Sequence, residues 1–163
     1  MMTEENKWDR LLKIKTTGRD DSQSDQYRYP YEPTPYSVLE RLGNTGYIRK
    51  GNTLLDYGCG KGRADFFLAW QTRCRAIGIE YDQRIYFFNP FSLEILRKVL
   101  GRIRESFYSR SREILLFFYY PSDEYVSYLM TVEEMTFFDE INCQDLFPGK
   151  DPREKILIFN FNF

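Results

Sequence analysis

Three glycines stand within five residues of one another, at Gly58, Gly60 and Gly62, directly after an apolar stretch with the character of a strand. Glycine lacks a Cβ, so such a loop lets the backbone pass close under a bound molecule. The residues after Gly62 predict a helix over 61–72, and the N-terminus of a helix offers unpaired backbone N–H groups to a ligand. This combination predicts a loop that binds a ligand through its backbone.

An acidic residue completes the pattern. Glu80 comes eighteen residues after Gly62, at the end of a second predicted strand over 75–80. An acid at the tip of the second strand is placed to accept hydrogen bonds from two ribose hydroxyls. Strand, glycine turn, helix, strand and acid therefore predict a nucleoside-binding α/β unit.

The glycine spacing distinguishes between ligands. A dinucleotide fingerprint, G-x-G-x-x-G, requires a glycine at the position of Arg63, so that fingerprint fails. Lys61 and Arg63 lie in the loop, but no G-x-x-x-x-G-K-[ST] sequence for a phosphate loop is present. The spacing that is present, G-x-G-x-G with Asp56 two residues before it, resembles motif I of class I S-adenosylmethionine (SAM)-dependent methyltransferases. The strand ending at Glu80 resembles their motif II.

This resemblance runs from about residue 29 to the C-terminus and implies SAM as cofactor and S-adenosylhomocysteine as product. Asp56 would organise the loop or receive the amino group of the methionine moiety, and Glu80 would bind the ribose. Tyr81 would stack on adenine, although an exposed aromatic residue at a turn is an equally good interpretation. The cofactor-binding residues that the resemblance implies are Asp56, Gly58, Cys59, Gly60, Gly62, Glu80 and Tyr81.

Asn89-Pro90-Phe91, after a further apolar stretch, is similar to the motif IV box (D/N/S)-P-P-(Y/F) of enzymes that methylate amine and amide nitrogens. In that box a polar side chain and a proline carbonyl accept hydrogen bonds from the target nitrogen, and the aromatic ring packs on the substrate. One proline is lacking here, so the three residues form either the catalytic box or only the floor of a pocket. Methyl transfer to a nitrogen held at Asn89, Pro90 and Phe91 is the reaction that the resemblance implies.

Composition limits the function classes. The chain of 163 residues contains no histidine, which excludes Ser-His-Asp and Cys-His nucleophiles and any histidine-ligated metal. Its three cysteines are widely spaced and imply neither a zinc site nor a disulfide framework, so a reducing cytoplasm is expected. The formal net charge of −1 favours a small-molecule acceptor slightly, while RNA and protein acceptors stay open. No apolar run is long enough to span a membrane.

The pattern of elements predicts an α/β fold, with residues 1–26 as a polar extension and 27–163 as a single methyltransferase-like domain. A short helix near 8–14 and a disordered tail are equally good interpretations of the N-terminus. Thr34 is expected to cap a helix that begins at Pro35. From residue 53 onward the expected strands are 53–57, 75–80, 85–89, 113–119, 135–142 and 155–163, and the expected helices are 61–72, 92–107 and 122–130. Continuous apolar runs such as 115–118 are typical of parallel strands that are buried on both faces. The last two strands are expected to form an antiparallel hairpin.

One connection breaks the pattern. Only about six residues separate Glu80 from the strand around Phe87, although parallel neighbours need a crossover of a dozen or more residues. Compared with the methyltransferase family, one helix and the third strand are missing. We therefore expect a three-layer Rossmann-like sheet that is mostly parallel, ends in a C-terminal antiparallel hairpin and is shortened at one edge. An internal deletion, a second copy that supplies the edge, and a tight turn over 81–85 compete as explanations. The short link also supports an alternative function, a non-catalytic SAM-binding or scaffold protein that dimerises through its open edge.

Overall fold

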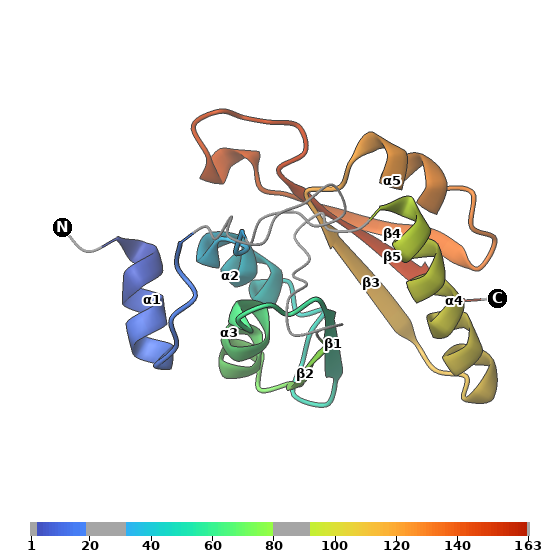
Figure 1. Ribbon diagram of the computed structural model, residues 1–163, viewed down its shortest axis with the longest axis horizontal. Coiled ribbons are helices and arrows are strands. Elements are labelled where there is room, and N and C mark those ends of the chain that lie inside the picture. The colour runs from blue at the N-terminus through green and yellow to red at the C-terminus, as the bar shows by residue number, and fades with distance from the viewer. Residues whose placement is uncertain (1–2, 19–31, 80–91, 163) are drawn as a thin grey trace. The chain divides into compact units, whose positions relative to one another are not determined.

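The structure, a computed structural model, describes residues 3–18, 32–79 and 92–162 of the chain (Figure 1). It divides into two compact units, Met1–Pro90 and Phe91–Phe163, and each is described by itself. The described strands form a two-stranded parallel sheet in the first unit and a three-stranded antiparallel sheet in the second. The protein is therefore mixed α/β, as the sequence predicts.

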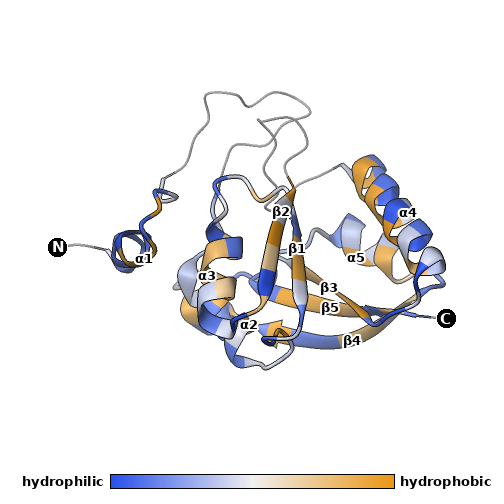
Figure 2. Cartoon of the chain, turned by 90° about the horizontal axis from the view of Figure 1, so that it is seen from below, coloured by the Kyte–Doolittle hydropathy of each residue, from blue (hydrophilic) through white to orange (hydrophobic). Residues whose placement is uncertain are grey.

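The first unit contains five elements in chain order. They are α1 (Glu4–Leu12), α2 (Tyr36–Asn44), β1 (Thr53–Tyr57), α3 (Arg63–Thr72) and β2 (Arg75–Ile79). β1 and β2 pair in parallel, and apolar colours dominate both strands in Figure 2. Helix α3 connects them, as a parallel pair requires.

An aromatic cluster joins the three helices of the first unit. The Trp8 ring of α1 packs edge-on against Phe67 and Trp70 of α3, with ring centroids 4.9 and 5.3 Å apart. Tyr36 of α2 lies 5.3 Å from Phe67 and is completely buried. Such large apolar rings supply much of the burial that holds a small unit together. The N-terminal segment therefore begins as a packed helix rather than as a disordered tail.

Two helix starts differ from the expected ones. α1 begins at Glu4 rather than near Trp8, because the Thr3 hydroxyl accepts a hydrogen bond from the Asn6 N–H and caps the helix. α2 has Pro35 as its N-cap residue, without a side-chain cap from within the segment. The Glu5 carboxylate accepts the Tyr36 N–H at 3.1 Å instead of the expected Thr34 cap. The cap of α2 thus comes from another helix.

The second unit runs α4 (Leu93–Ser109), β3 (Ile114–Tyr119), α5 (Asp123–Leu129), β4 (Met135–Asn142), the short 3₁₀ helix η1 (Gln144–Leu146) and β5 (Lys155–Phe161). The strand order is β3-β5-β4, and β4 and β5 form the expected antiparallel hairpin. One face of β5, with Leu157, Phe159 and Phe161, packs in a core with residues of α4 and α5. Ile156 and Ile158 on its other face are buried as well.

The direction of β3 relative to β5 corrects one inference. The apolar run 115–118 indicated a parallel strand, yet β3 pairs antiparallel with β5, its described neighbour. Because β5 is itself apolar on both faces, a continuous apolar run reports burial and not strand direction. The predicted strand 85–89 and the short link after Glu80 lie outside the described residues.

Candidate functional site

The carboxyl ends of β1 and β2 lie side by side. In the parallel register Asp56 pairs with Gly78, and Tyr57 pairs with Ile79. The loop after β1 is attached directly to β2, because the Gly58 N–H donates to the Ile79 carbonyl at 2.6 Å. In an α/β unit this edge is where ligands bind.

The glycine loop, residues 58–62, has the conformation that its composition suggests. Gly58, Gly60 and Gly62 have φ angles of 82°, 51° and 76°, all in the left-handed region where side chains are disfavoured. The Gly62 N–H closes the loop by donating to the Cys59 carbonyl at 2.7 Å. The three glycines are therefore required by the backbone path itself.

Helix α3 starts directly from this loop, with Gly62 as its N-cap residue. The Phe66 N–H donates to the Gly62 carbonyl at 3.0 Å, which is the first turn of the helix. The N–H groups of a first helical turn find no partner inside the helix and carry the positive end of its dipole. The edge of the sheet thus offers backbone donors beside Asp56.

A second carboxylate that the sequence analysis did not single out lies at the base of this loop. Asp65, in the first turn of α3, is half-buried, and its Oδ1 atom is buried without a hydrogen-bond partner in the described part of the chain. Burial, and then the nearby charge of Asp56, raise the pKa of Asp65 to about 7. Near neutral pH the Asp65 carboxyl is therefore partly protonated, and its orphaned oxygen can accept or donate a hydrogen bond.

Gly78 is the other residue missing from the predicted site. A Cβ at this position would lie 2.6 Å from Cys59 Sγ and 2.7 Å from Cys59 Cβ, and closer still to the Asp65 carboxylate. Only glycine lets the loop and α3 approach β2 so closely. A glycine inside an otherwise apolar strand is the sequence signal that could have identified it.

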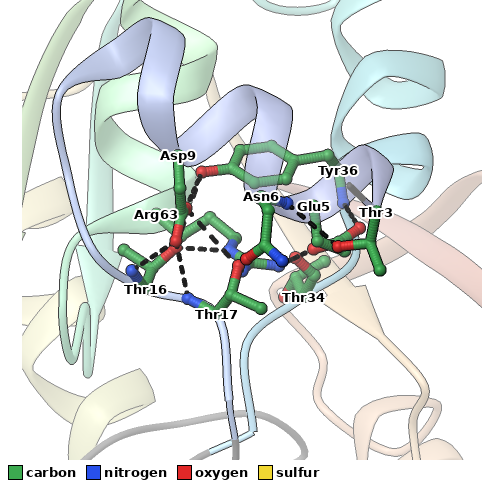
Figure 3. A network of polar contacts seen from close by, with 9 residues as sticks. All are labelled: Thr3, Glu5, Asn6, Asp9, Thr16, Thr17, Thr34, Tyr36 and Arg63. Carbon is green, nitrogen blue, oxygen red and sulfur yellow. Dashed lines mark hydrogen bonds and ion pairs between the residues drawn. The ribbon is translucent and has the colours of Figure 1, made fainter. Parts of the chain in front are cut away.

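Arg63 occupies a buried network rather than a ligand-facing position (Figure 3). Its Nε donates to Thr16 Oγ1 at 2.8 Å, its Nη1 to the Glu5 carboxylate and to the Thr34 carbonyl, and its Nη2 to Thr17 Oγ1 at 3.0 Å. Only 4% of the side chain is exposed. Protein groups therefore occupy all three guanidinium nitrogens, which removes Arg63 as a phosphate ligand.

Asp9 anchors the same network from α1. It accepts hydrogen bonds from the Thr16 hydroxyl at 2.6 Å, the Tyr36 hydroxyl at 2.6 Å and the Thr16 and Thr17 N–H groups. Burial alone would raise the pKa of Asp9, but these hydrogen bonds outweigh it and hold that pKa well below its usual range. Burial and the hydrogen bond to Asp9 raise the pKa of Tyr36 above its usual value. The network thus contains a carboxylate that is ionised at neutral pH.

The second unit has its own polar cluster at the end of β3. The Tyr119 hydroxyl donates to Glu154 at 2.5 Å, and the Tyr120 hydroxyl donates to Asp151 at 2.7 Å with Arg153 stacked 4.6 Å from its ring. Tyr120 has a φ of 53°, unusual for a side chain of this size. Acidic partners thus hold both hydroxyls.

The arginines and the one lysine of α4 are partly neutralised. Lys98 pairs with Glu94, Arg102 with Glu105 and Arg104 with Glu134. The first two pairs are largely exposed to solvent. A solvated helix face therefore accounts for the basic character of this segment.

Five of the predicted site residues lie outside the described residues. They are Glu80 and Tyr81 at the cofactor site and Asn89, Pro90 and Phe91 at the acceptor site. The others lie next to one another where β1 ends: Asp56 in the strand, and Gly58, Cys59, Gly60 and Gly62 in the glycine loop that follows it. Within the described ranges, no helix has both the length and the apolar character needed to cross a membrane.

One comparison with known proteins gives a partial match. Over 67 residues the chain is 37% identical to a histone-lysine N-methyltransferase, H3 lysine-79 specific, of Dictyostelium discoideum. The match covers 41% of this chain and about 4% of the length of that protein. No protein-family profile matches the chain, and no solved structure matches it.

Proposed function

We propose that this protein is a SAM-dependent methyltransferase whose cofactor binds at the glycine loop. The observation that carries the proposal is the loop itself: three left-handed glycines lead from Asp56 into the N-terminus of α3, at the carboxyl edge of a parallel strand pair. The partial likeness to a histone-lysine methyltransferase supports the same reaction class.

The residues present fit such a cofactor. The loop backbone is compact enough for close approach, and Asp56 and the orphaned Asp65 oxygen offer acceptors for an amino group beside it. By the resemblance, Glu80 holds the ribose hydroxyls and Tyr81 stacks on adenine. SAM, when bound, supplies a methyl group that is already activated by its sulfonium, so this chain needs no strong nucleophile of its own.

The protein's part in the reaction is binding and orientation. The helix N-terminus and the loop fix one end of the cofactor, and Asn89 and a backbone carbonyl of the Asn89-Pro90-Phe91 box accept hydrogen bonds from the acceptor nitrogen. Positioning of this kind can supply most of the acceleration for an activated donor. We propose a small-molecule acceptor in the cytoplasm, with residues 27–163 as the methyltransferase domain on a shortened Rossmann-like sheet. The C-terminal hairpin is consistent with that sheet.

Calorimetric titration of S-adenosylhomocysteine tests the proposal, using protein whose intact mass has been checked. We expect saturable one-to-one binding that Glu80→Ala abolishes. Glu40→Ala, which changes an exposed glutamate of the same unit, is the matched control and should bind like the wild type. Absence of binding by the folded wild-type protein would refute the proposal and leave the scaffold interpretation.

A further inference from the structure

The N-terminal segment contacts Arg63, the residue that directly follows the glycine loop. We propose that residues 3–17, named here the N-terminal clasp, position the glycine loop for its ligand by holding Arg63. Arg63 is then a positioning residue, and the clasp is part of the binding site although none of its residues touches the ligand. The inference rests on the proposed function, since it concerns affinity for the same cofactor.

The first step is the burial of a charge. Arg63 is 4% exposed, and an isolated buried guanidinium is strongly unfavourable unless it is paired and hydrogen-bonded. Four of its polar partners belong to the clasp: the Glu5 carboxylate, the Thr16 and Thr17 hydroxyls, and Asp9, whose Oδ1 lies 3.9 Å from Nη2. Outside the clasp its contacts are the Thr34 carbonyl at 3.2 Å and the Tyr36 ring, 4.3 Å from Cζ. Without the clasp, the charge would lose both carboxylates.

The second step is the position of Arg63 in the chain. It is the first residue of α3 and follows Gly62, which has a φ of 76° and no side chain to cap the helix. Any shift of the Arg63 backbone therefore passes directly into the bond between the Gly62 N–H and the Cys59 carbonyl. One peptide bond separates Arg63, which the clasp holds, from Gly62, the last residue of the loop.

The third step is the geometry of the first helical turn. Residues two apart on a helix point about 200° apart, so Arg63 and Asp65 face nearly opposite sides. Arg63 points into the clasp network, while Asp65 packs against Gly78 and Cys59. The first turn of α3 is thus held from two sides, by the clasp on one and by β2 with the loop on the other. Removal of one side frees the turn to move.

Amide hydrogen exchange of the full-length protein tests this without any ligand. The reporter is the Gly62 N–H, and the internal reference is the Arg75 N–H, which donates to the Asn52 carbonyl at the opposite end of the strand pair. In Asp9→Asn we expect exchange at Gly62 to accelerate at least ten-fold more than at Arg75. Equal acceleration at both amides, or none at Gly62, would overturn the proposal, because it would show only global destabilisation or no effect.

A milder pair of variants keeps the test decisive where Asp9→Asn fails to fold. Thr17→Val removes the hydroxyl that receives the Nη2 hydrogen bond but conserves the shape of the side chain, and Thr17→Ser restores the hydroxyl. We expect faster Gly62 exchange in the valine variant and wild-type exchange in the serine variant. Glu40→Ala, an exposed change on α2 and outside the clasp, is the control for general effects on the first unit.

Affinity gives the second readout. When the loop is competent only about one-tenth of the time, the apparent Kd rises about ten-fold. We therefore expect S-adenosylhomocysteine to bind Asp9→Asn about ten-fold more weakly than the wild type and to bind Glu40→Ala normally. If S-adenosylhomocysteine binds the wild type and Asp9→Asn with equal affinity, the proposed role of the clasp is refuted and the proposed function is not. Absence of binding to the wild type would refute the proposed function, and the exchange measurement would still decide whether the clasp holds the loop.

Discussion

Replacement of Gly78 by alanine is the sharpest test of how the glycine loop packs on β2. The added Cβ would lie 2.6 and 2.7 Å from Sγ and Cβ of Cys59, against an ordinary contact distance of at least 3.4 Å. Sγ can rotate away, but Cβ of Cys59 is fixed to the loop backbone, which is itself hydrogen-bonded to β2 through Gly58. The loop must therefore move as a body.

Overpacking of this kind costs about 1–3 kcal/mol of unfolding free energy. Urea unfolding followed by tryptophan fluorescence measures the unfolding free energy of the first structural unit. Both tryptophans of the chain, Trp8 and Trp70, lie within residues 1–90. We also expect Gly78→Ala to weaken the binding of S-adenosylhomocysteine, since the displaced loop is the proposed cofactor site.

Two other glycines of the same unit serve as matched controls. An alanine at Gly51 meets no atom within 4 Å, so we expect a change within about 0.5 kcal/mol. At Gly43 the three atoms nearest to an added Cβ all belong to the end of the Gln71 side chain, which can rotate, and alanine gains helix propensity of up to about 1 kcal/mol. If Gly78→Ala unfolds at the same urea concentration as Gly51→Ala, the close packing of the loop on β2 is wrong.

Three further predictions concern stability. Burial, and then the charge of Asp56, raise the folded-state pKa of Asp65 from 3.8 to about 7, so its contribution to stability is present at low pH and is lost as pH rises from about 4 to above 7. The melting temperature measured between pH 4.5 and 8 should therefore fall with rising pH in the wild type and change less in Asp65→Asn. Tyr36→Phe removes a 2.6 Å hydrogen bond to the buried Asp9 carboxylate and should lower the unfolding free energy by about 1.5–3 kcal/mol in urea titrations. Leu129→Ala, at a side chain with 0% exposure in the core of the second unit, should cost about 2–5 kcal/mol by far-UV circular dichroism, and a loss below 1 kcal/mol would contradict that core.

Local patterns determine much of the fold. The bounds predicted for the strands 53–57 and 135–142 coincide with β1 and β4, and the expected helix 92–107 corresponds to α4 within two residues. These elements depend on apolar periodicity and turn residues, which are visible in a short window. The start of α1 was also encoded locally, by Thr3 and the two acidic residues that follow it.

Tertiary partners determine what the sequence could not show. The cap of α2 comes from Glu5, 31 residues before Tyr36, and Arg63 finds its partners up to 58 residues away. In the candidate site the glycine loop was predictable from spacing, whereas the raised pKa of Asp65 arises from its burial in the folded chain and, second, from the charge of Asp56. Nothing in the residues around Arg63 indicates that its side chain is buried among protein partners.

The polar residues that are buried in the described part of the chain support the connection between the clasp and the loop. They are Asp9, Thr16 and Arg63, and all three belong to one network. A buried ion pair contributes little net stability, and an apolar replacement of similar volume is often as stable or more so. Stability alone therefore does not account for a charged cluster in a unit that already has an aromatic core. What an arginine provides and a leucine does not is a fixed orientation toward several acceptors at once. That orientation is imposed on the first residue of α3, next to the glycine loop that forms the proposed cofactor site.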